Sequence, residues 1–320
     1  MVTGAPKRLS RIVSLASAMT LGLAAIMPTS TMAAAYASPQ PPASHWITST
    51  NYRYPGNDGK HHAVSWDKYS YMIDDHHLNI WSGEVHYWRL PSPHQWRDVL
   101  QKMKAAGFNA VSFYFFWGYH QSAPDSPFDF SGIRNIDLLL RMAAEEGLYV
   151  IARPGPYINA EISMGGMPAW QTNSSLPLRN AWDNTNWQQQ RAWLHAVNKI
   201  IARHQVTNGG GSVLLYQVEN EELASVGPYA DYVKKIIKAA KEDGINVPIF
   251  HNDYAPVGNW AFTTKDTGLD VYSYDDYPIR FDCSATRHKL QDHNWHIDPA
   301  FRAAHPVSYT HLRAHETRHD

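Results

Sequence analysis

The sequence predicts an α/β fold of the (β/α)8 TIM-barrel type, incomplete, with about six of the eight strand–helix units present in 320 residues. Three times a helical pattern ends on a glycine and an apolar strand pattern follows within two or three residues, at Gly107, Gly147 and Gly244. Strands that alternate with helices form a parallel sheet whose faces are covered. A doubly wound sheet also fits six strands, but no Gly-x-Gly-x-x-Gly run follows the first strand, so we favour the barrel.

The first 60 residues differ from the rest of the chain and are not expected to belong to the barrel. Three basic residues precede an uncharged stretch at 12–27, and Ala-Tyr-Ala at 35–37 is a small-residue cleavage site. This order of features predicts a secretory signal peptide over residues 1–37 and a secreted, extracellular protein. The uncharged stretch has 16 residues, fewer than the roughly 20 that span a bilayer, so no stable membrane anchor is expected. Proline and glycine without apolar periodicity indicate a linker or extended arm at 38–60.

The strands of the barrel are expected where apolar runs of strand length occur, at residues 80–87, 109–116, 148–153, 213–219, 247–251 and 270–274. The helices between them are indicated by apolar residues that repeat every three or four positions. The first helix is predicted to begin at Ser92-Pro93, an N-cap followed by a first-turn proline, and to end at Gly107. Further apolar stripes, each on one helix face, occupy residues 133–143, 186–205 and 233–240.

The composition excludes several classes of protein. The formal net charge is −1 and only 18% of the residues are charged, so we expect no nucleic acid as a partner. Aromatic residues make up 12%, and rings with polar edges suit sugars. No phosphate-binding loop, Gly-x-Ser-x-Gly elbow or grouping of three metal-ligand histidines occurs, so no metal or cofactor is expected. The single cysteine, Cys283, is either a buried free thiol or has its partner outside this chain.

Polar side chains follow the expected strands, where the reactive residues of a parallel barrel lie. They are Tyr114 after the second strand, Asn159 and Glu161 after the third, Glu219 to Glu222 after the fourth, Asn252 and Asp253 after the fifth, and Asp275 to Tyr277 after the sixth. Such a set suits glycoside hydrolysis, in which one carboxylic acid protonates the leaving oxygen and a second carboxylate attacks the sugar or activates water. Glu221 has neighbouring glutamates that would keep an acid protonated. The alternative is that these glutamates only begin a helix.

Four blocks of sequence stand out by their order and spacing. They are Ser-Gly-Glu-Val-His-Tyr-Trp-Arg at 82–89, Ala-Arg-Pro-Gly-Pro-Tyr-Ile-Asn-Ala-Glu at 152–161, Leu-Tyr-Gln-Val-Glu-Asn-Glu at 215–221, and Gly-Leu-Asp-Val-Tyr at 268–272 with Tyr277-Pro278 and Phe281-Asp282-Cys283. Together they resemble the β-galactosidases of glycoside hydrolase family 35, over about residues 74–300. The resemblance implies a (β/α)8 catalytic barrel, a retaining mechanism with two glutamates, and a galactoside or galactose-containing glycan as substrate.

The same resemblance implies roles for residues at the strand ends. Glu221 falls on the general acid/base of the family, and Asn220 on the residue that binds the 2-hydroxyl of galactose. The family needs no metal for its chemistry. The other substrate-binding residues that the resemblance implies are Asn159 and Glu161, which would contact galactose hydroxyls, and the pocket-lining Tyr114 and Tyr277.

The sequence departs from the family pattern in three places. The loop at 162–168 reads Ile-Ser-Met-Gly-Gly-Met-Pro where a Gly-Gly-Gly-Phe-Pro run is usual, and Phe116 stands where an aspartate is common. The nucleophile of the family is a strand-seven glutamate in a Glu-Phe-Gln-Gly-Gly context, which does not occur here. Residues 308–320 are polar, resemble translated sequencing adapters and include Glu316 outside that context. We therefore expect a truncated barrel over 61–307, a non-native tail at 308–320, a nucleophile absent from this chain, and an inactive fragment.

Two other functions are compatible with the sequence. An exo-β-glucosaminidase or another glycosidase would use the same barrel and glutamates, because the preference for one sugar depends on the placement of a few side chains. A galactose-binding protein without turnover would differ from the enzyme by lacking the strand-seven glutamate.

Overall fold

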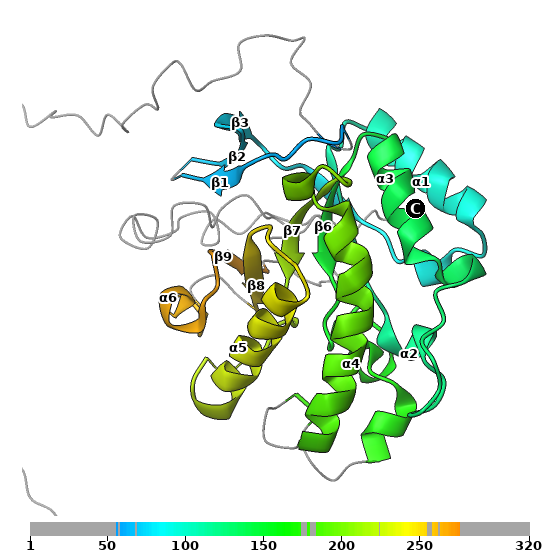
Figure 1. The fold of residues 1–320 in the computed structure, drawn as a ribbon, viewed down its shortest axis with the longest axis vertical. Helices are drawn as coiled ribbons and strands as arrows, with labels where there is room; N and C mark the ends of the chain where they lie inside the picture. The colour runs from blue at the N-terminus through cyan, green and yellow to red at the C-terminus, as the bar shows by residue number, and fades with distance from the viewer. Residues whose placement is uncertain are drawn as a thin grey trace, which may run out of the picture. The chain divides into compact units, whose positions relative to one another are not determined.

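The computed structural model describes the central part of the chain, which forms two β-sheets with helices (Figure 1). The described residues are 56, 58–67, 69–173, 178–179, 184–223, 225–254, 258–261 and 263–275. The expected signal peptide, most of the expected linker, Tyr277, Cys283 and the expected tail at 308–320 lie outside them. In this part of the chain, no helix combines the length and the apolar content needed to cross a membrane.

Six parallel strands, hydrogen-bonded in chain order, form the larger sheet. They are β4 (Ser82–Glu84), β5 (Ala110–Tyr114), β6 (Tyr149–Arg153), β7 (Val213–Gln217), β8 (Ile249–Asp253) and β9 (Val271–Tyr274). Each overlaps one of the six predicted strands, which confirms the prediction of about six strand–helix units of a (β/α)8 barrel. Strands β5 to β8 are buried at all five positions, as expected for parallel strands covered on both faces.

Four long helices pack in one core with the parallel strands, and Figure 1 shows them around one side of the sheet. They are α1 (Pro93–Ala105), α3 (Ile136–Glu145), α4 (Asn184–Ile201) and α5 (Gly227–Glu242), accompanied by the short helices α2 (Trp117–His120) and α6 (Thr264–Thr267). Turns of 3-10 helix lie at Tyr87–Arg89, Gly132–Arg134, Ser163–Gly166, Ala169–Asn173, Ala202–His204 and Val206–Asn208. The predicted apolar stripes form the contacts, since Trp96, Val197 and Ile236 are fully buried.

The helix ends follow local capping chemistry. Ser92 caps α1 as predicted, with its side chain accepting a hydrogen bond from a first-turn N–H. Ile133 was expected on the next stripe, but it lies before α3 and is 38% exposed. The reason is that the Asn135 side chain accepts a hydrogen bond from a first-turn N–H at 2.9 Å and starts the helix after itself. The helix predicted over 186–205 ends at Ile201 and continues as 3-10 turns.

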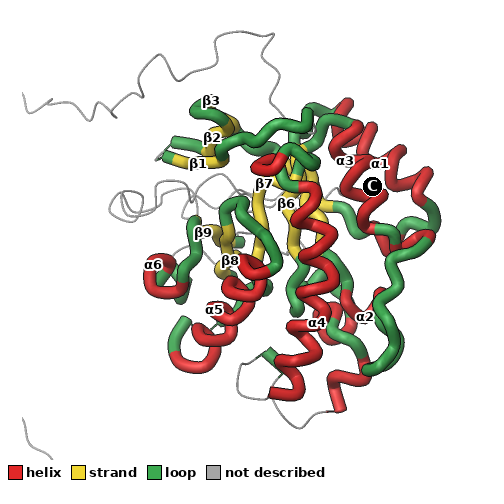
Figure 2. The backbone as a smooth tube through the Cα atoms, in the orientation of Figure 1, coloured by secondary structure: helices red, strands yellow, loops and turns green. Residues whose placement is uncertain are grey.

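A smaller antiparallel sheet precedes the barrel strands, and the sequence patterns do not predict it (Figure 2). Its strands, in order, are β1 (Val64–Trp66), β2 (Tyr71–Ile73) and β3 (His76–Leu78). Three residues are too few to show a period of two clearly. The turn between β2 and β3 is Asp74-Asp75, which lacks the glycine typical of two-residue hairpin turns. Both aspartates nevertheless have positive φ, 49° and 63°.

The face of the parallel sheet opposite the long helices carries two kinds of side chain. Towards the N-terminal ends of the strands, Ile151 and Phe250 belong to a second core that includes Tyr71 of the small sheet. Two residues further along the same strands are Arg153 and Asn252, and residues two apart in a strand share a face. The small sheet therefore packs towards the N-terminal ends of the parallel strands, and a polar layer lies at their C-terminal ends.

Candidate active site

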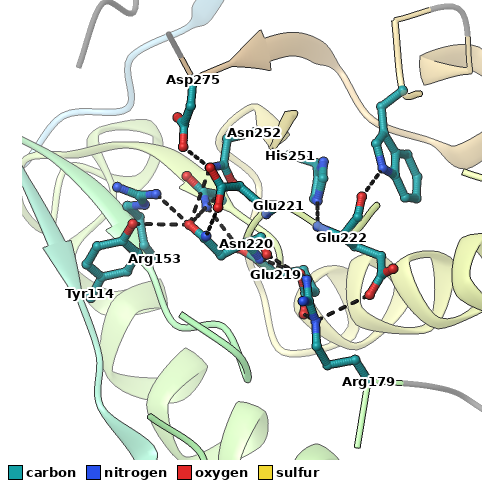
Figure 3. A network of polar contacts seen from close by, with 12 residues as sticks. Tyr114, Arg153, Arg179, Glu219, Asn220, Glu221, Glu222, His251, Asn252 and Asp275 are labelled. Carbon is teal, nitrogen blue, oxygen red and sulfur yellow. Dashed lines mark hydrogen bonds and ion pairs between the residues drawn. The ribbon is translucent and has the colours of Figure 1, made fainter. Parts of the chain in front are cut away.

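Polar side chains from five neighbouring strands meet at the C-terminal ends of the parallel strands, as Figure 3 shows. They are Tyr114 at the end of β5, Arg153 at the end of β6, Asn220 after β7, Asn252 in β8 and Asp275 after β9. The ends of parallel strands lie at one edge of a sheet, so residues distant in sequence become neighbours. We call these five residues, together with Glu221, the polar cluster.

The side-chain oxygen of Asn220 is the acceptor at the centre of the polar cluster. Asn220 is fully buried. Its Oδ1 accepts hydrogen bonds from the Tyr114 hydroxyl (3.1 Å), Arg153 Nη2 (2.9 Å) and Asn252 Nδ2 (3.3 Å). These donors determine which end of the amide is the oxygen. The Nδ2 group consequently faces Glu221, 3.5 Å from its Oε2, and the amide is oriented to donate on the side of that carboxyl.

Asn252 links the ends of β7, β8 and β9. Its Oδ1 accepts hydrogen bonds from Gln217 Nε2 at 2.6 Å and from the backbone N–H of Glu221 at 3.4 Å. Its Nδ2 donates to Asp275 Oδ2 at 3.0 Å. Asn252 and Asp275 are only 2% and 3% exposed, so these buried polar groups satisfy one another.

Glu221 lies in an unusual backbone turn. Glu219 and Glu221 both have positive φ, 57° and 50°, a left-handed conformation that costs a non-glycine residue about 1–2 kcal/mol. Glu221 is half-buried, whereas Glu219 and Glu222 are 0% and 6% exposed. Helix α5 begins only at Gly227 and has no acidic residue in its first turn. The alternative that these glutamates begin a helix is therefore wrong.

A buried ion pair that the sequence patterns do not indicate holds this turn. Arg179 Nε and Nη2 donate to the two carboxylate oxygens of Glu219 at 2.7 and 2.6 Å, and Nη2 also donates to the carbonyl of Asn220 at 2.6 Å. Arg179 Nε lies 3.3 Å from Glu222, and the guanidinium stacks on the ring of Tyr157 at 4.0 Å. Burial raises the pKa of Glu219 to about 7, while the charge of Arg179 opposes the rise.

A second buried ion pair positions Tyr114. Arg153 Nη1 donates to Glu84 at 2.7 Å, and the guanidinium of Arg153 lies 3.8 Å from the centroid of the Tyr114 ring. On the other side, Glu84 Oε1 is 2.9 Å from His86 Nε2. The ends of β4 and β6 thus hold the ring whose hydroxyl reaches Asn220.

The predicted residues Asn159 and Glu161 lie on the loop after β6. Asn159, Ala160 and Glu161 all have positive φ, 52°, 52° and 49°. Asn159 is half-buried and Glu161 is exposed. Within the described residues, no hydrogen bond joins either side chain to the polar cluster. The structure therefore brings Tyr114, Asn220 and Glu221 together, and it does not describe Tyr277. Ile158 and Ala160 of this loop pack against Tyr114, but Asn159 and Glu161 are not hydrogen-bonded to the polar cluster in the described part of the chain.

A cavity of about 580 Å³ opens beside Arg179. Its wall includes Tyr157, Ile162, Met164, Met167, Leu178, Glu222 and Tyr229. The unusual loop at 162–168 forms much of this wall, and it requires glycine at Gly165, where a Cβ would lie 2.1 Å from the ring of Tyr157. The described part of the chain contains no group of three His, Cys, Asp or Glu side chains placed to hold a metal ion.

Known proteins from fungi are similar in sequence to this chain. "Probable beta-galactosidase C" of Aspergillus clavatus is 43% identical over 235 residues, which cover 71% of this chain and 24% of that protein. The protein of the same name from Penicillium rubens is 37% identical over 250 residues, 76% of this chain and 25% of that protein. The chain thus spans about a quarter of the length of these curated relatives.

A solved structure shares the fold of this chain, and a family model matches its sequence. The exo-beta-1,4-mannosidase Op5Man5 from Opitutaceae bacterium strain TAV5 superposes with a TM-score of 0.50, covering 63% of this chain and 39% of that chain at 14% identity, a likeness of fold alone. The model of Glycosyl hydrolases family 35 matches residues 70–315. With the six parallel strands and the polar cluster at their C-terminal ends, this match shows that the chain belongs to glycosyl hydrolase family 35.

Proposed function

We propose that this chain carries part of the catalytic site of a retaining exo-β-galactosidase, which removes terminal non-reducing β-D-galactose from galactosides and glycans. The observation that carries the proposal is the orientation of the Asn220 amide. Its oxygen is occupied by donors from three strands, so its NH2 group is directed to the side of Glu221. Family membership and the printed names of the relatives support galactose as the sugar.

In this proposal, Glu221 is the general acid/base. Its carboxyl protonates the leaving oxygen in the first step and removes a proton from water in the second. Asn220 Nδ2 donates to the 2-hydroxyl of the galactose. Tyr114, Asn159, Glu161 and Tyr277 are proposed to contact the rest of the sugar. A retaining mechanism needs a second carboxylate about 5–5.5 Å from the first, and we assign that role to none of the described residues and not to Glu316.

Glu221→Gln in the natural full-length protein tests the proposal. The loss of a general acid is expected to lower kcat/KM by about 10²–10⁴-fold for alkyl or sugar leaving groups. The loss should be much smaller for dinitrophenyl galactoside, whose leaving group needs no proton. Glu242→Gln is the matched control, because Glu242 lies on the exposed surface at the far end of α5.

The outcomes of this test separate the functional alternatives. Equal losses on all leaving groups would contradict the role of Glu221. Faster hydrolysis of a nitrophenyl glucosaminide than of the galactoside would favour the exo-β-glucosaminidase. Galactose binding without any turnover would favour a galactose-binding protein.

We also propose that the protein is exported and begins near Ser38 after processing. The support is the order of basic flank, apolar stretch and small-residue site within the first 37 residues. Mass spectrometry of the secreted protein should give an N-terminus close to Ser38. A membrane-bound product that retains Met1 would contradict the proposal.

A further inference from the structure

Two consecutive side chains of β8 hold the two peptide groups on either side of the Glu221 α-carbon. Asn252 Oδ1 accepts from the N–H of Glu221 at 3.4 Å, and His251 Nε2 accepts from the N–H of Glu222 at 3.0 Å. Successive residues of a strand point to opposite faces, so the two acceptors leave β8 on different faces of the sheet; Figure 3 shows both side chains beside the turn. Asn252 belongs to the polar cluster, whereas His251 lies outside it.

Trp260, which packs against His251, binds the other backbone polar group of Glu222. His251 is 1% exposed, and its ring centroid lies 4.7 Å from that of the fully buried Trp260. The indole N–H of Trp260 donates to the carbonyl of Glu222. Both backbone polar groups of the residue after Glu221 are therefore held by side chains from β8 and from the segment that follows it.

His251 holds the peptide only as a neutral ring. Because Nε2 accepts a hydrogen bond, the ring proton must be on Nδ1. Burial lowers the pKa of His251 to about 3, with the positive charge of Arg179 acting in the same direction. The next residue of β8 but one, Asp253, accepts a hydrogen bond from the backbone N–H of Trp260 at 2.9 Å.

A turn with two left-handed glutamates needs such anchors. Glu219 and Glu221 are in a conformation that residues other than glycine rarely adopt and that persists only where the surroundings enforce it. If the N–H of Glu222 lost its acceptor, the backbone would be free to relax at Glu221. The carboxyl of Glu221 would then move relative to Asn220.

We propose that His251 is a positioning residue for Glu221, acting through the peptide group that joins Glu221 to Glu222. The inference rests on the proposed function, in which Glu221 is the general acid/base. His251 itself exchanges no proton with the substrate.

The test compares three variants of the natural full-length protein. His251→Leu removes the acceptor, and His251→Gln restores one near the position of Nε2. His204→Leu is the control, because His204 is also a buried histidine, but it precedes the N-terminal end of β7 and contacts Asp137. A displaced acid affects mainly substrates that need protonation. We therefore expect His251→Leu to lower kcat/KM on an alkyl galactoside on the order of 10²-fold, with a much smaller loss on dinitrophenyl galactoside.

We also expect His251→Gln to recover kcat/KM on the alkyl galactoside. The control His204→Leu should lose little kcat/KM, and equally on both substrates. Equal losses on both substrates in His251→Leu, or no recovery by glutamine, would overturn the inference. If Glu221→Gln itself shows no dependence on the leaving group, the proposed function fails first. If Glu221→Gln shows it and His251→Leu does not, only the role of His251 fails.

A measurement on the natural full-length protein without substitutions covers the case in which a variant does not fold. The ¹⁵N chemical shifts of the His251 ring should show a protonated Nδ1 and an unprotonated Nε2 from pH 8 to pH 5. A doubly protonated ring at pH 5, or a proton on Nε2, would overturn the inference.

Discussion

Arg179 carries the charge that the fully buried carboxylate of Glu219 faces, and we expect Arg179→Met to destabilise the fold. Leaving one partner of a buried ion pair uncompensated costs about 3–5 kcal/mol, and Glu219 has no exposed side-chain surface. The cost should be largest near pH 8 and smaller near pH 5. A buried carboxyl without its cation avoids charge by binding a proton, which becomes harder as the pH rises. Urea unfolding at both pH values measures the free energy of unfolding.

Arg203→Met is the matched control for this prediction. Arg203 lies 3.0 Å from Asp137, but the two side chains are 60% and 36% exposed. Exposed ion pairs contribute about 0–1 kcal/mol. Similar losses of unfolding free energy in the two variants would show that the pair of Arg179 and Glu219 contributes no more than an exposed ion pair.

At the scale of single residues, the sequence predicts which polar side chains meet at the strand ends better than it predicts the residues that hold them in place. Tyr114, Asn220 and Glu221 stand directly at strand ends, so counting strands was enough to bring them to one edge. His251 is the last residue of a predicted strand, and nothing in the pattern separates a histidine that accepts a peptide N–H from one that only packs in the core. Arg179 stands in a segment without periodicity, and its partner is 40 residues away. Supports of this kind depend on tertiary contacts that a one-dimensional pattern does not contain.

At the scale of elements, the turn between β2 and β3 offers a stabilising change. Asp75 is exposed and has a φ of 63°, which glycine adopts without steric cost. Asp75→Gly is therefore expected to raise the free energy of unfolding by about 0.5–1 kcal/mol. Asp74 is kept, since its carboxylate accepts a hydrogen bond from the N–H of Ala63 at 2.9 Å. Thermal or urea unfolding measures the change.

Asp125→Gly controls for the flexibility that glycine adds to the unfolded chain. Asp125 is also exposed in a turn, but it is not among the residues with positive φ. Glycine there should be neutral or destabilising. A loss of stability in Asp75→Gly as large as that in Asp125→Gly would contradict the argument from the backbone conformation.

The lengths of the elements explain why the barrel helices and strands could be predicted and the small sheet could not. Helices of 10 to 18 residues such as α3 and α4 repeat their apolar stripe several times, and glycine marks the helix ends. The buried parallel strands follow as five-residue segments that are mostly apolar. Strands β1 to β3 have three residues each, and their pairing depends on the core they share with distant strands.

At the scale of the whole molecule, buried neutral histidines predict loss of stability in acid. Burial lowers the pKa of His120 to about 4 and that of His251 to about 3, and it also lowers the pKa of His204. At these three histidines the unfolded state therefore binds more protons than the folded state below about pH 6.5. Glu219 acts the other way, because burial raises its pKa to about 7, but it is one group against three. Stability present above that pH is lost as the pH falls towards about 4. Urea midpoints should decrease from pH 7.5 to pH 5, and equal midpoints would contradict the prediction.

The small sheet also has a consequence for the order in which the chain can fold. Tyr71 and Phe250, which belong to the same core, are separated by 179 positions, and contacts so distant in sequence form slowly. At about 5–20 residues per second, a ribosome needs roughly 10–35 s to make the chain between them. During that interval the core that covers the apolar face of β2 is incomplete. The N-terminal strands are thus synthesised first and completed last, and a chaperone that binds apolar segments should be found on residues 64–80 of the nascent chain.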